Sequence, residues 1–281
     1  TYVGYFAGKG ATGVDGYNTA VGSNAFLAVT TGEHNVAIGR NAMKSTLDGA
    51  RNVCVGADAG SDGDLTTDNV FVGHRSGWKS TGNKNVCIGT NTMGADWATS
   101  SALTNSGSNV FIGYGSGSGA WASNTKEFNV AIGQNTLAGA LNATVGAVAI
   151  GHSALAALTT GVANTAVGYT AGTAITSGDF NTALGYEALL TEDLGFGTTA
   201  VGYRAAYLQN SDDADEVPAN TAIGAKALYT NVDGQQLTAV GYESLYTFEA
   251  DSDNHGGNTA VGYRAGKFIS TGTNNTFMGK E

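Results

Sequence analysis

The chain has 281 residues, of which 43 are Gly and only one is Pro. Collagen is excluded because it needs Gly at every third position and abundant Pro, and a hydrophobic content of 42% is too high for a disordered chain. A net charge of −10 opposes binding to nucleic acid and to anionic membranes, and no apolar run is long enough to span a bilayer.

A short pattern of residues fills the chain from its first residues to its last. It reads Asn, β-branched residue, small residue, aliphatic residue, Gly, as in Asn35–Gly39 and Asn164–Gly168. We count sixteen copies, with anchor glycines from Gly4 to Gly279, and most steps between anchors are 16 to 18 residues long. A fixed short period predicts a repeat architecture in which each turn contacts mainly its neighbours. We therefore interpret residues 1–281 as a single repeat domain.

Positions within each repeat are numbered here from its anchor Gly. Position −3 is Thr or Val and position −1 is aliphatic in every copy, which predicts a short strand. Position −4 is Asn in twelve of the fifteen copies that have it. Asn tolerates a left-handed backbone, and stacked Asn side chains form hydrogen-bonded ladders. The anchor Gly is expected to supply a positive φ at a corner.

A second Gly follows ten residues after many anchors, as in Gly32, Gly49 and Gly178. Each repeat is thus expected to contain a strand, a Gly corner, a second short strand and a second corner. This pattern predicts an all-β chain that forms a parallel β-roll or β-helix solenoid of about sixteen coils, with a rise of about 4.8 Å per coil.

Position −2 is the observation on which the predicted assembly depends. It is mostly Ala, with an occasional Cys or aromatic residue, so the strand avoids polar groups on both faces. Strands that are apolar on both faces are normally covered on both faces. We expect one face to line the coil and the other to meet further copies of the chain, most simply in a homotrimer. The residues predicted to pack between chains are Ala37, Cys54, Phe71, Cys87, Phe111, Ala166, Ala183, Ala260 and Phe277. The alternative is a monomeric solenoid with an Ala-surfaced strand.

Both cysteines, Cys54 and Cys87, occupy this column two repeats apart. Two coils correspond to roughly 10 Å, which is too far for a disulfide. We interpret both as small buried hydrophobic residues.

Four long steps in the period predict surface loops near residues 94–108, 115–128, 206–219 and 246–257. Insertions in solenoids map to surface loops that are often functional, although neutral decoration is the alternative. The residues considered for ligand binding in these loops are Trp97, Trp121, Asp212, Asp213 and Asp251. The clustered carboxylates suit either Ca²⁺ or simple solvation, and they match neither the EF-hand loop nor the glycine-rich calcium nonapeptide.

The sequence offers no recognisable catalytic or metal-binding arrangement. No Cys/His spacing is typical of a zinc site, and no Ser/His/Asp set or carboxylate pair stands out from the repeat. We therefore expect no catalytic residue, no cofactor, no metal ligand and no enzymatic activity.

The repeat resembles those of known fibrous proteins. Asn164–Tyr169, followed by a Thr-x-Gly corner and a restart after seventeen residues, resembles repeats of long phage tail fibres. The segment Ala37–Ala42 is similar to the head repeat of trimeric autotransporter adhesins, whose repeats are nearer 14 or 15 residues. The resemblance covers essentially the whole chain and implies trimers of parallel β-rolls.

These observations lead to one expected function with open alternatives. We expect a structural segment of an extracellular trimeric fibre, on a virion or cell surface, that gives reach and displays loops for attachment to a host-surface receptor or glycan. The alternative is the head of a bacterial trimeric adhesin, or a self-assembling filament subunit whose copies stack end to end. An ice-binding solenoid needs a flat exposed Thr array, and the Thr residues at position −3 are expected to be buried.

Overall fold

The computed structural model describes residues 1–10, 16–93, 106–119, 126–211, 218–248 and 256–281, and contacts divide the chain into two units, Thr1–Val145 and Gly146–Glu281. Each unit is a parallel β-solenoid, and the described residues contain no helix. Together the units carry about 14 turns rather than the sixteen coils expected.

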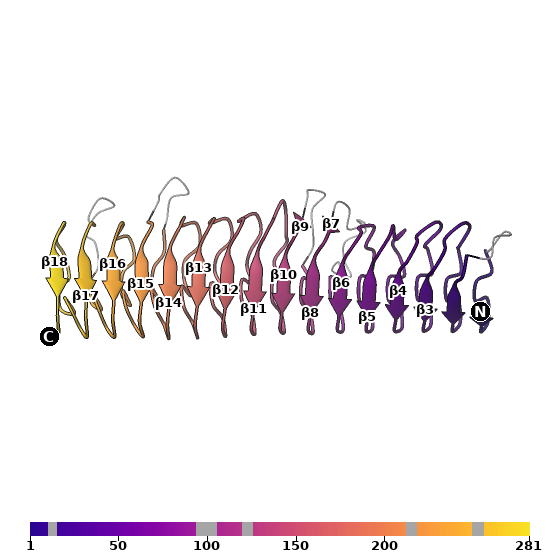
Figure 1. Cartoon of the computed structure of the whole chain (residues 1–281), viewed down its shortest axis with the longest axis horizontal. Coiled ribbons are helices and arrows are strands. Elements are labelled where there is room, and N and C mark those ends of the chain that lie inside the picture. Colours follow the sequence, from indigo (N-terminus) through magenta and orange to yellow (C-terminus); the bar gives the residue numbers. More distant parts are fainter. Residues whose placement is uncertain (11–15, 94–105, 120–125, 212–217, 249–255) are drawn as a thin grey trace. The chain divides into compact units, whose positions relative to one another are not determined.

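The strands of unit 1 pair in parallel in chain order (Figure 1). Each residue pairs with the residue at the same position of the next repeat, for example Ala37 with Cys54. The strands of this sheet are β1 (Tyr2–Val3), β2 (Thr19–Val21), β3 (Val36–Ile38), β4 (Val53–Val55), β5 (Val70–Val72), β6 (Val86–Ile88), β8 (Val110–Ile112) and β10 (Val130–Ile132).

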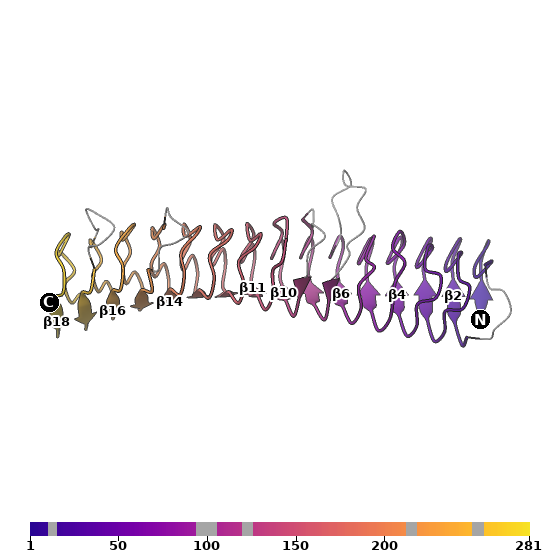
Figure 2. The same ribbon diagram turned by 90° about the horizontal axis from the view of Figure 1, so that it is seen from above.

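Unit 2 has the same arrangement, with a register that pairs Ala166 with Ala183. In the view from above, the strands of each unit follow one side of its turns (Figure 2). The strands are β11 (Val148–Ile150), β12 (Thr165–Val167), β13 (Thr182–Leu184), β14 (Thr199–Val201), β15 (Thr221–Ile223), β16 (Thr238–Val240), β17 (Thr259–Val261) and β18 (Thr276–Met278).

The second strand expected in every repeat is mostly absent from the described residues. The described residues outside the main sheet contain one strand pair, β7 (Ser106–Gly107) and β9 (Lys126–Glu127), and a few isolated bridges, and this pair lies at the second corner rather than between the two corners. After each anchor the chain instead makes a series of turns in which positions +2 and +4 have a left-handed backbone, as at Arg204 (φ 55°) and Leu228 (φ 52°). These turns still hydrogen-bond from coil to coil, but the left-handed residues break the extended conformation that a strand needs.

The prediction for the anchor glycines is confirmed. Gly22 has φ +132°, and a Cβ at this position would lie 2.6 Å from the carbonyl oxygen of Gly39 in the next turn. No other residue combines that backbone conformation with so close an approach between turns.

The Asn ladder is also confirmed. In unit 1, the Oδ1 of Asn35 accepts a hydrogen bond from the backbone N–H of Asn52 at 2.9 Å, and its Nδ2 donates to the carbonyl of Gly49 at 2.6 Å. The same contacts recur from Asn18 to Asn129. In contrast to the expectation, the left-handed residue is not this Asn but the one before it, such as His34 (φ 58°).

Positions −2 and +4 both point into the core, and in many turns a large residue at one accompanies a small residue at the other. Where position −2 is Phe71, position +4 is Gly77, whose added Cβ would clash with the Phe71 ring. Where position −2 is Ala222, position +4 is Leu228, and both side chains are fully buried. In these two turns a large residue at one position therefore faces a small residue at the other.

Candidate interaction surfaces

The column at position −2 lies inside the chain's own coil. Eight of the nine residues predicted to pack between chains, all except Phe277, are at most 1% exposed in the single chain, and Phe277 is half-buried in the last turn. The prediction that this column forms the contact between chains is therefore wrong. Alternation along a strand places positions −4 and −2 on the same face, so the buried Asn ladder already marks that face as internal.

Cys54 and Cys87 are free and fully buried, as the sequence predicted. Burial raises the pKa of both thiols well above the ordinary value, so neither is poised as a nucleophile.

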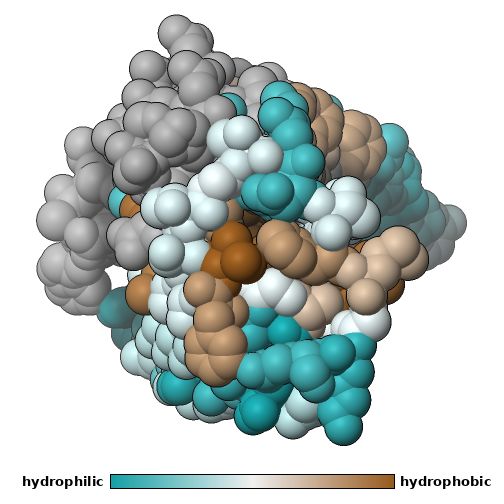
Figure 3. Space-filling model, turned by 90° about the vertical axis from the view of Figure 1, so that its left-hand side faces the viewer, coloured by the Kyte–Doolittle hydropathy of each residue, from teal (hydrophilic) through white to brown (hydrophobic). Residues whose placement is uncertain are grey.

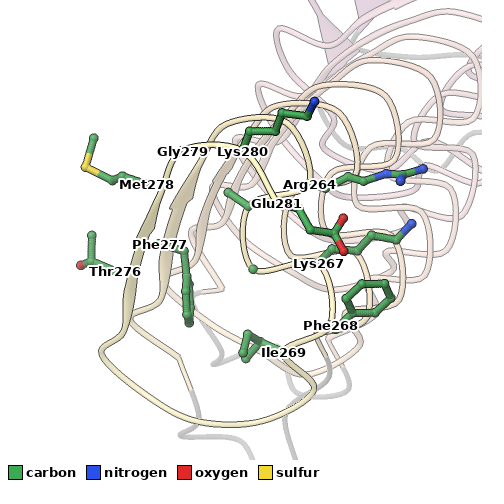
Figure 4. Close-up of a pocket in the computed structure, with 12 residues that line it drawn as sticks. Arg264, Lys267, Phe268, Ile269, Thr276, Phe277, Met278, Gly279, Lys280 and Glu281 are labelled. Atoms are coloured by element: carbon green, nitrogen blue, oxygen red, sulfur yellow. The ribbon is translucent and has the colours of Figure 1, made fainter.

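The face that remains exposed is formed by positions −3 and −1, which we call the outer strand face. Figure 4 shows this in the last turn, where Phe277 points into the coil while Thr276 and Met278 point away from it. Large aliphatic side chains on this face are partly exposed, including Ile38 (40%) and Ile223 (41%). The outer strand face is thus an apolar, β-branched stripe that the chain does not cover itself.

The residues considered in the inserted loops, Trp97, Trp121, Asp212, Asp213 and Asp251, lie outside the described residues. His255 also lies there, and His34, His74 and His152 are exposed on the surface.

Two tyrosine ladders follow the turns of unit 2. At position +1, Tyr169, Tyr186 and Tyr203 stack on one another with ring centroids 5.1 and 5.7 Å apart. At position +5, Tyr229 stacks between Tyr207 and Tyr246, with centroids 5.0 Å apart on each side and nearly parallel planes. Both spacings follow from the distance between neighbouring parallel strands. The first ladder is more open, since Tyr203 is 44% exposed.

Cationic side chains lie among these rings. The guanidinium of Arg204 is 5.1 Å from the ring centroids of both Tyr203 and Tyr207, and the ammonium of Lys226 is 5.8 Å from that of Tyr229. Arg204 also pairs with Glu187 at 2.6 Å, and this carboxylate raises its pKa. We call positions +1, +2 and +5 of unit 2 the tyrosine strip.

In unit 1 the corresponding positions line a hollow of about 310 Å³. Within it, Asp58 accepts hydrogen bonds from Asn41 at 2.9 Å and from Arg40 at 3.1 Å. Sequence reasoning missed Trp78, which borders this hollow, because it considered only the Trp residues of the inserted loops. The lining residues are Arg40, Asn41, Lys44, Asp58, Ser61, Asp62, Arg75 and Trp78.

A buried carboxylate lies in the core of unit 2. Glu192 accepts hydrogen bonds from the backbone N–H groups of Gly195 at 2.7 Å and Ser211 at 3.2 Å. Burial raises the pKa of this carboxyl above its ordinary 4.5. The group is fully buried within its own coil, and we assign it a structural role.

The described residues contain no group of His, Cys, Asp and Glu side chains arranged to hold a metal ion. They also contain no helix long and apolar enough to cross a membrane. A hollow of about 490 Å³ lies at the last turn of unit 2 (Figure 4). Seen end-on, apolar residues occupy the middle of this end, and polar residues lie below them (Figure 3). The hollow is the open end of the coil's core.

No known protein family, curated protein or solved structure matches this chain.

Proposed function

We propose that the chain is a structural segment of a trimeric extracellular fibre, most simply a phage tail fibre, that provides reach and presents surfaces for attachment to a host receptor or glycan. The head of a bacterial trimeric adhesin or a subunit of a surface filament is the alternative setting. The observation that carries the proposal is the outer strand face.

That face supports self-association because it repeats without interruption along each unit. Its position −1 carries Val, Ile, Leu or Met in every turn, and its position −3 carries Val or Thr. Contiguous exposed apolar patches of this kind mark interaction sites in soluble proteins. A partner with the same turn spacing matches such a face along its whole length, and another copy of the chain is the simplest partner of that kind.

A trimer is favoured because the stripe is one strand wide. Three narrow outer strand faces that meet at a common axis bury one another on all sides. Two such faces would leave the sides of each stripe exposed to solvent. The four chain features of repetition, short strands, Gly corners and buried Asn ladders supply stiffness, and trimerisation covers the second apolar face.

The test is the mass of the native particle, measured by light scattering and native mass spectrometry. We expect three times the 28.3 kDa of one chain. Replacing Ile223, which is 41% exposed in the single chain, by Glu places a charge in the proposed contact and is expected to dissociate it.

Leu208→Glu is the matched control, because Leu208 is 37% exposed but lies off the outer strand face. It is expected to leave the mass unchanged. A wild-type particle with the mass of one chain, or equal effects of the two variants, would contradict the proposal.

A second candidate function, ice binding, is favoured by one observation in unit 2. Position −3 is Thr in seven consecutive turns. The sequence analysis expected these residues to be buried, but they lie on the outer strand face. The residues are Thr165, Thr182, Thr199, Thr221, Thr238, Thr259 and Thr276. Ice binding needs this face to be open, so thermal hysteresis by a particle of one-chain mass would favour it over the fibre.

A further inference from the structure

The tyrosine strip contains every tyrosine and every cationic residue of unit 2. Each Tyr, Lys and Arg of residues 146–281 lies at position +1, +2 or +5. The eight tyrosines are Tyr169, Tyr186, Tyr203, Tyr207, Tyr229, Tyr242, Tyr246 and Tyr263, and the five cations are Arg204, Lys226, Arg264, Lys267 and Lys280. Fourteen acidic residues share the same unit, and only three of them, Glu187, Glu243 and Glu281, lie on the strip.

The strip is therefore the one face of an acidic unit that carries more positive than negative groups. Two of the three carboxylates are engaged by cations of the strip: Glu187 by Arg204, and Glu243 by Arg264 at 2.9 Å and Lys267 at 2.6 Å. The lysine beside it lowers the pKa of Glu243. Lys226 makes no ion pair among the described residues and lies against the ring of Tyr229.

The chemistry of the strip selects a ligand that is both anionic and rich in hydroxyl groups. Tyr186 and Tyr229 are each stacked between two other Tyr rings, so a flat aromatic ligand finds no open face on these two rings. Tyr hydroxyl groups donate and accept hydrogen bonds, and Arg and Lys bind carboxylates. The rings recur every 5.0 to 5.7 Å, a spacing close to the length of one extended sugar unit.

We propose that the tyrosine strip binds a linear acidic polysaccharide of the uronic-acid type, laid along the turns of unit 2. Successive sugars contact successive Tyr hydroxyls, and their carboxylates contact Lys226 and the neighbouring cations. The inference rests on the proposed function, since it moves glycan attachment from the inserted loops to the regular surface of the fibre.

The strip is compatible with the proposed trimer. In the last turn, Arg264 and Lys267 extend to the side of the coil opposite Thr276 and Met278 (Figure 4). A chain whose outer strand face is covered by other copies therefore still presents its tyrosine strip to solvent.

Unit 1 provides the internal comparison. Its eight cations are not gathered in the same way: Arg51 and Lys84 lie at position −5, and Lys126 is buried. Its tyrosines at position +1, Tyr5 and Tyr114, are widely separated along the chain. The proposed ligand has no matching ladder there.

The experiment measures binding of the full chain to an alginate oligosaccharide by titration calorimetry at low salt. A cello-oligosaccharide of the same length serves as the neutral probe, and a single-stranded oligonucleotide of similar charge as the non-glycan polyanion. We expect binding to alginate alone, and weakening as salt screens the charges. Lys226→Gln removes a charged contact and is expected to raise the dissociation constant roughly tenfold. Tyr229→Phe, which removes one hydroxyl, is expected to raise it by a smaller factor.

Lys44→Gln and Tyr114→Phe are the controls, since they remove the same groups in unit 1 at positions +5 and +1, and neither is expected to alter binding. Equal effects of Lys44→Gln and Lys226→Gln, or equal affinity for the oligonucleotide, would overturn the proposal, as would absence of alginate binding by a folded particle. Light scattering on the same samples separates the two proposals. Absence of alginate binding by a particle of trimer mass would contradict the binding proposal and leave the trimer standing. Alginate binding by a particle of one-chain mass would contradict the trimer and leave the binding proposal standing.

Discussion

Units 1 and 2 are built from the same repeat, yet their outward columns differ. Position −3 is Val from Val36 to Val130 in unit 1 and Thr from Thr165 to Thr276 in unit 2. Unit 1 has eight cations against nine acidic residues, and unit 2 has five against fourteen. The inward column at position −2, in contrast, is formed by Ala, Cys and aromatic residues in unit 1 and by Ala and one Phe in unit 2. The coil thus constrains the residue types at inward positions, and the two units differ in chemistry at their outward positions.

The inward columns differ in one respect, which is the Asn ladder. It is continuous from Asn18 to Asn129 in unit 1 but interrupted at Ala147, Thr198 and Leu237 in unit 2. Near the interruption, the Nδ2 of Asn220 donates instead to the Oε1 of Gln209 at 2.9 Å. Gln209 therefore supplies an acceptor where the preceding ladder position, Thr198, has no amide oxygen.

The largest expected effect tests the compensation between positions −2 and +4. Phe71→Ala in unit 1 opens a cavity and is expected to lower the free energy of unfolding by about 3–5 kcal/mol in chemical denaturation. Adding Gly77→Leu reproduces the Ala222 and Leu228 arrangement of unit 2 and is expected to recover part of that loss. Gly77→Leu alone should destabilise, because the Phe71 ring fills that space. Additive costs in the double variant would show that the columns do not compensate.

The next effect tests the ladder. Asn52→Ala removes the acceptor of the buried Asn69 N–H and the donor to the Thr66 carbonyl, so we expect a loss of about 3 kcal/mol in the free energy of unfolding. Asn258→Ala in unit 2 is expected to cost less, because Leu237 precedes it in the ladder and leaves Asn258 with fewer partners. Denaturation midpoints that shift equally would contradict a ladder whose strength depends on continuity.

Glu192 provides a pH test confined to unit 2. Its folded-state pKa lies above the ordinary 4.5, so the folded state holds the proton more tightly and stability is lost as pH rises from about 4.5 through the folded pKa. Glu192→Gln keeps an acceptor for Gly195 and Ser211. It is expected to raise the free energy of unfolding by about 1–2 kcal/mol at pH 7 and to flatten its pH dependence above pH 4.5. A variant whose pH profile parallels that of the wild type would contradict this origin.

The smallest effect concerns the outward charges of unit 1. Arg51 forms a hydrogen-bonded ion pair with Asp68 at 2.7 Å, but both side chains are exposed. Arg51→Gln is expected to leave the denaturation midpoint unchanged at physiological salt, because exposed ion pairs contribute little. A clear shift in that midpoint would show that outward columns also stabilise the coil.

Much of the fold followed from the sequence because the repeat itself encodes it. The strand residues, the positive φ of the anchor glycines and the Asn ladder were predicted from residue type and spacing. Which face of the strand points into the coil was predicted wrongly. Positions −4 and −2 lie on the same face of a strand, so the buried Asn at −4 already indicated that position −2 points inward. The left-handed residues at +2 and +4 were missed because Arg, Lys and Leu rarely adopt that conformation, and here hydrogen bonds between turns enforce it. The sequence showed the recurring Tyr at position +1. Most of the cations of the tyrosine strip lie at other positions, and their closeness to the rings became apparent only in the folded coil.

The most direct test of the covered outer strand face is thiol labelling of Ile223→Cys and Leu208→Cys by a water-soluble reagent in the native particle. The two side chains have similar exposure in a single chain, and the native Cys54 and Cys87 are buried within the coil and give no background. We predict that the thiol at position 223 reacts at least about tenfold more slowly than the thiol at position 208, since only the first is covered by neighbouring chains. Equal labelling rates would contradict the account.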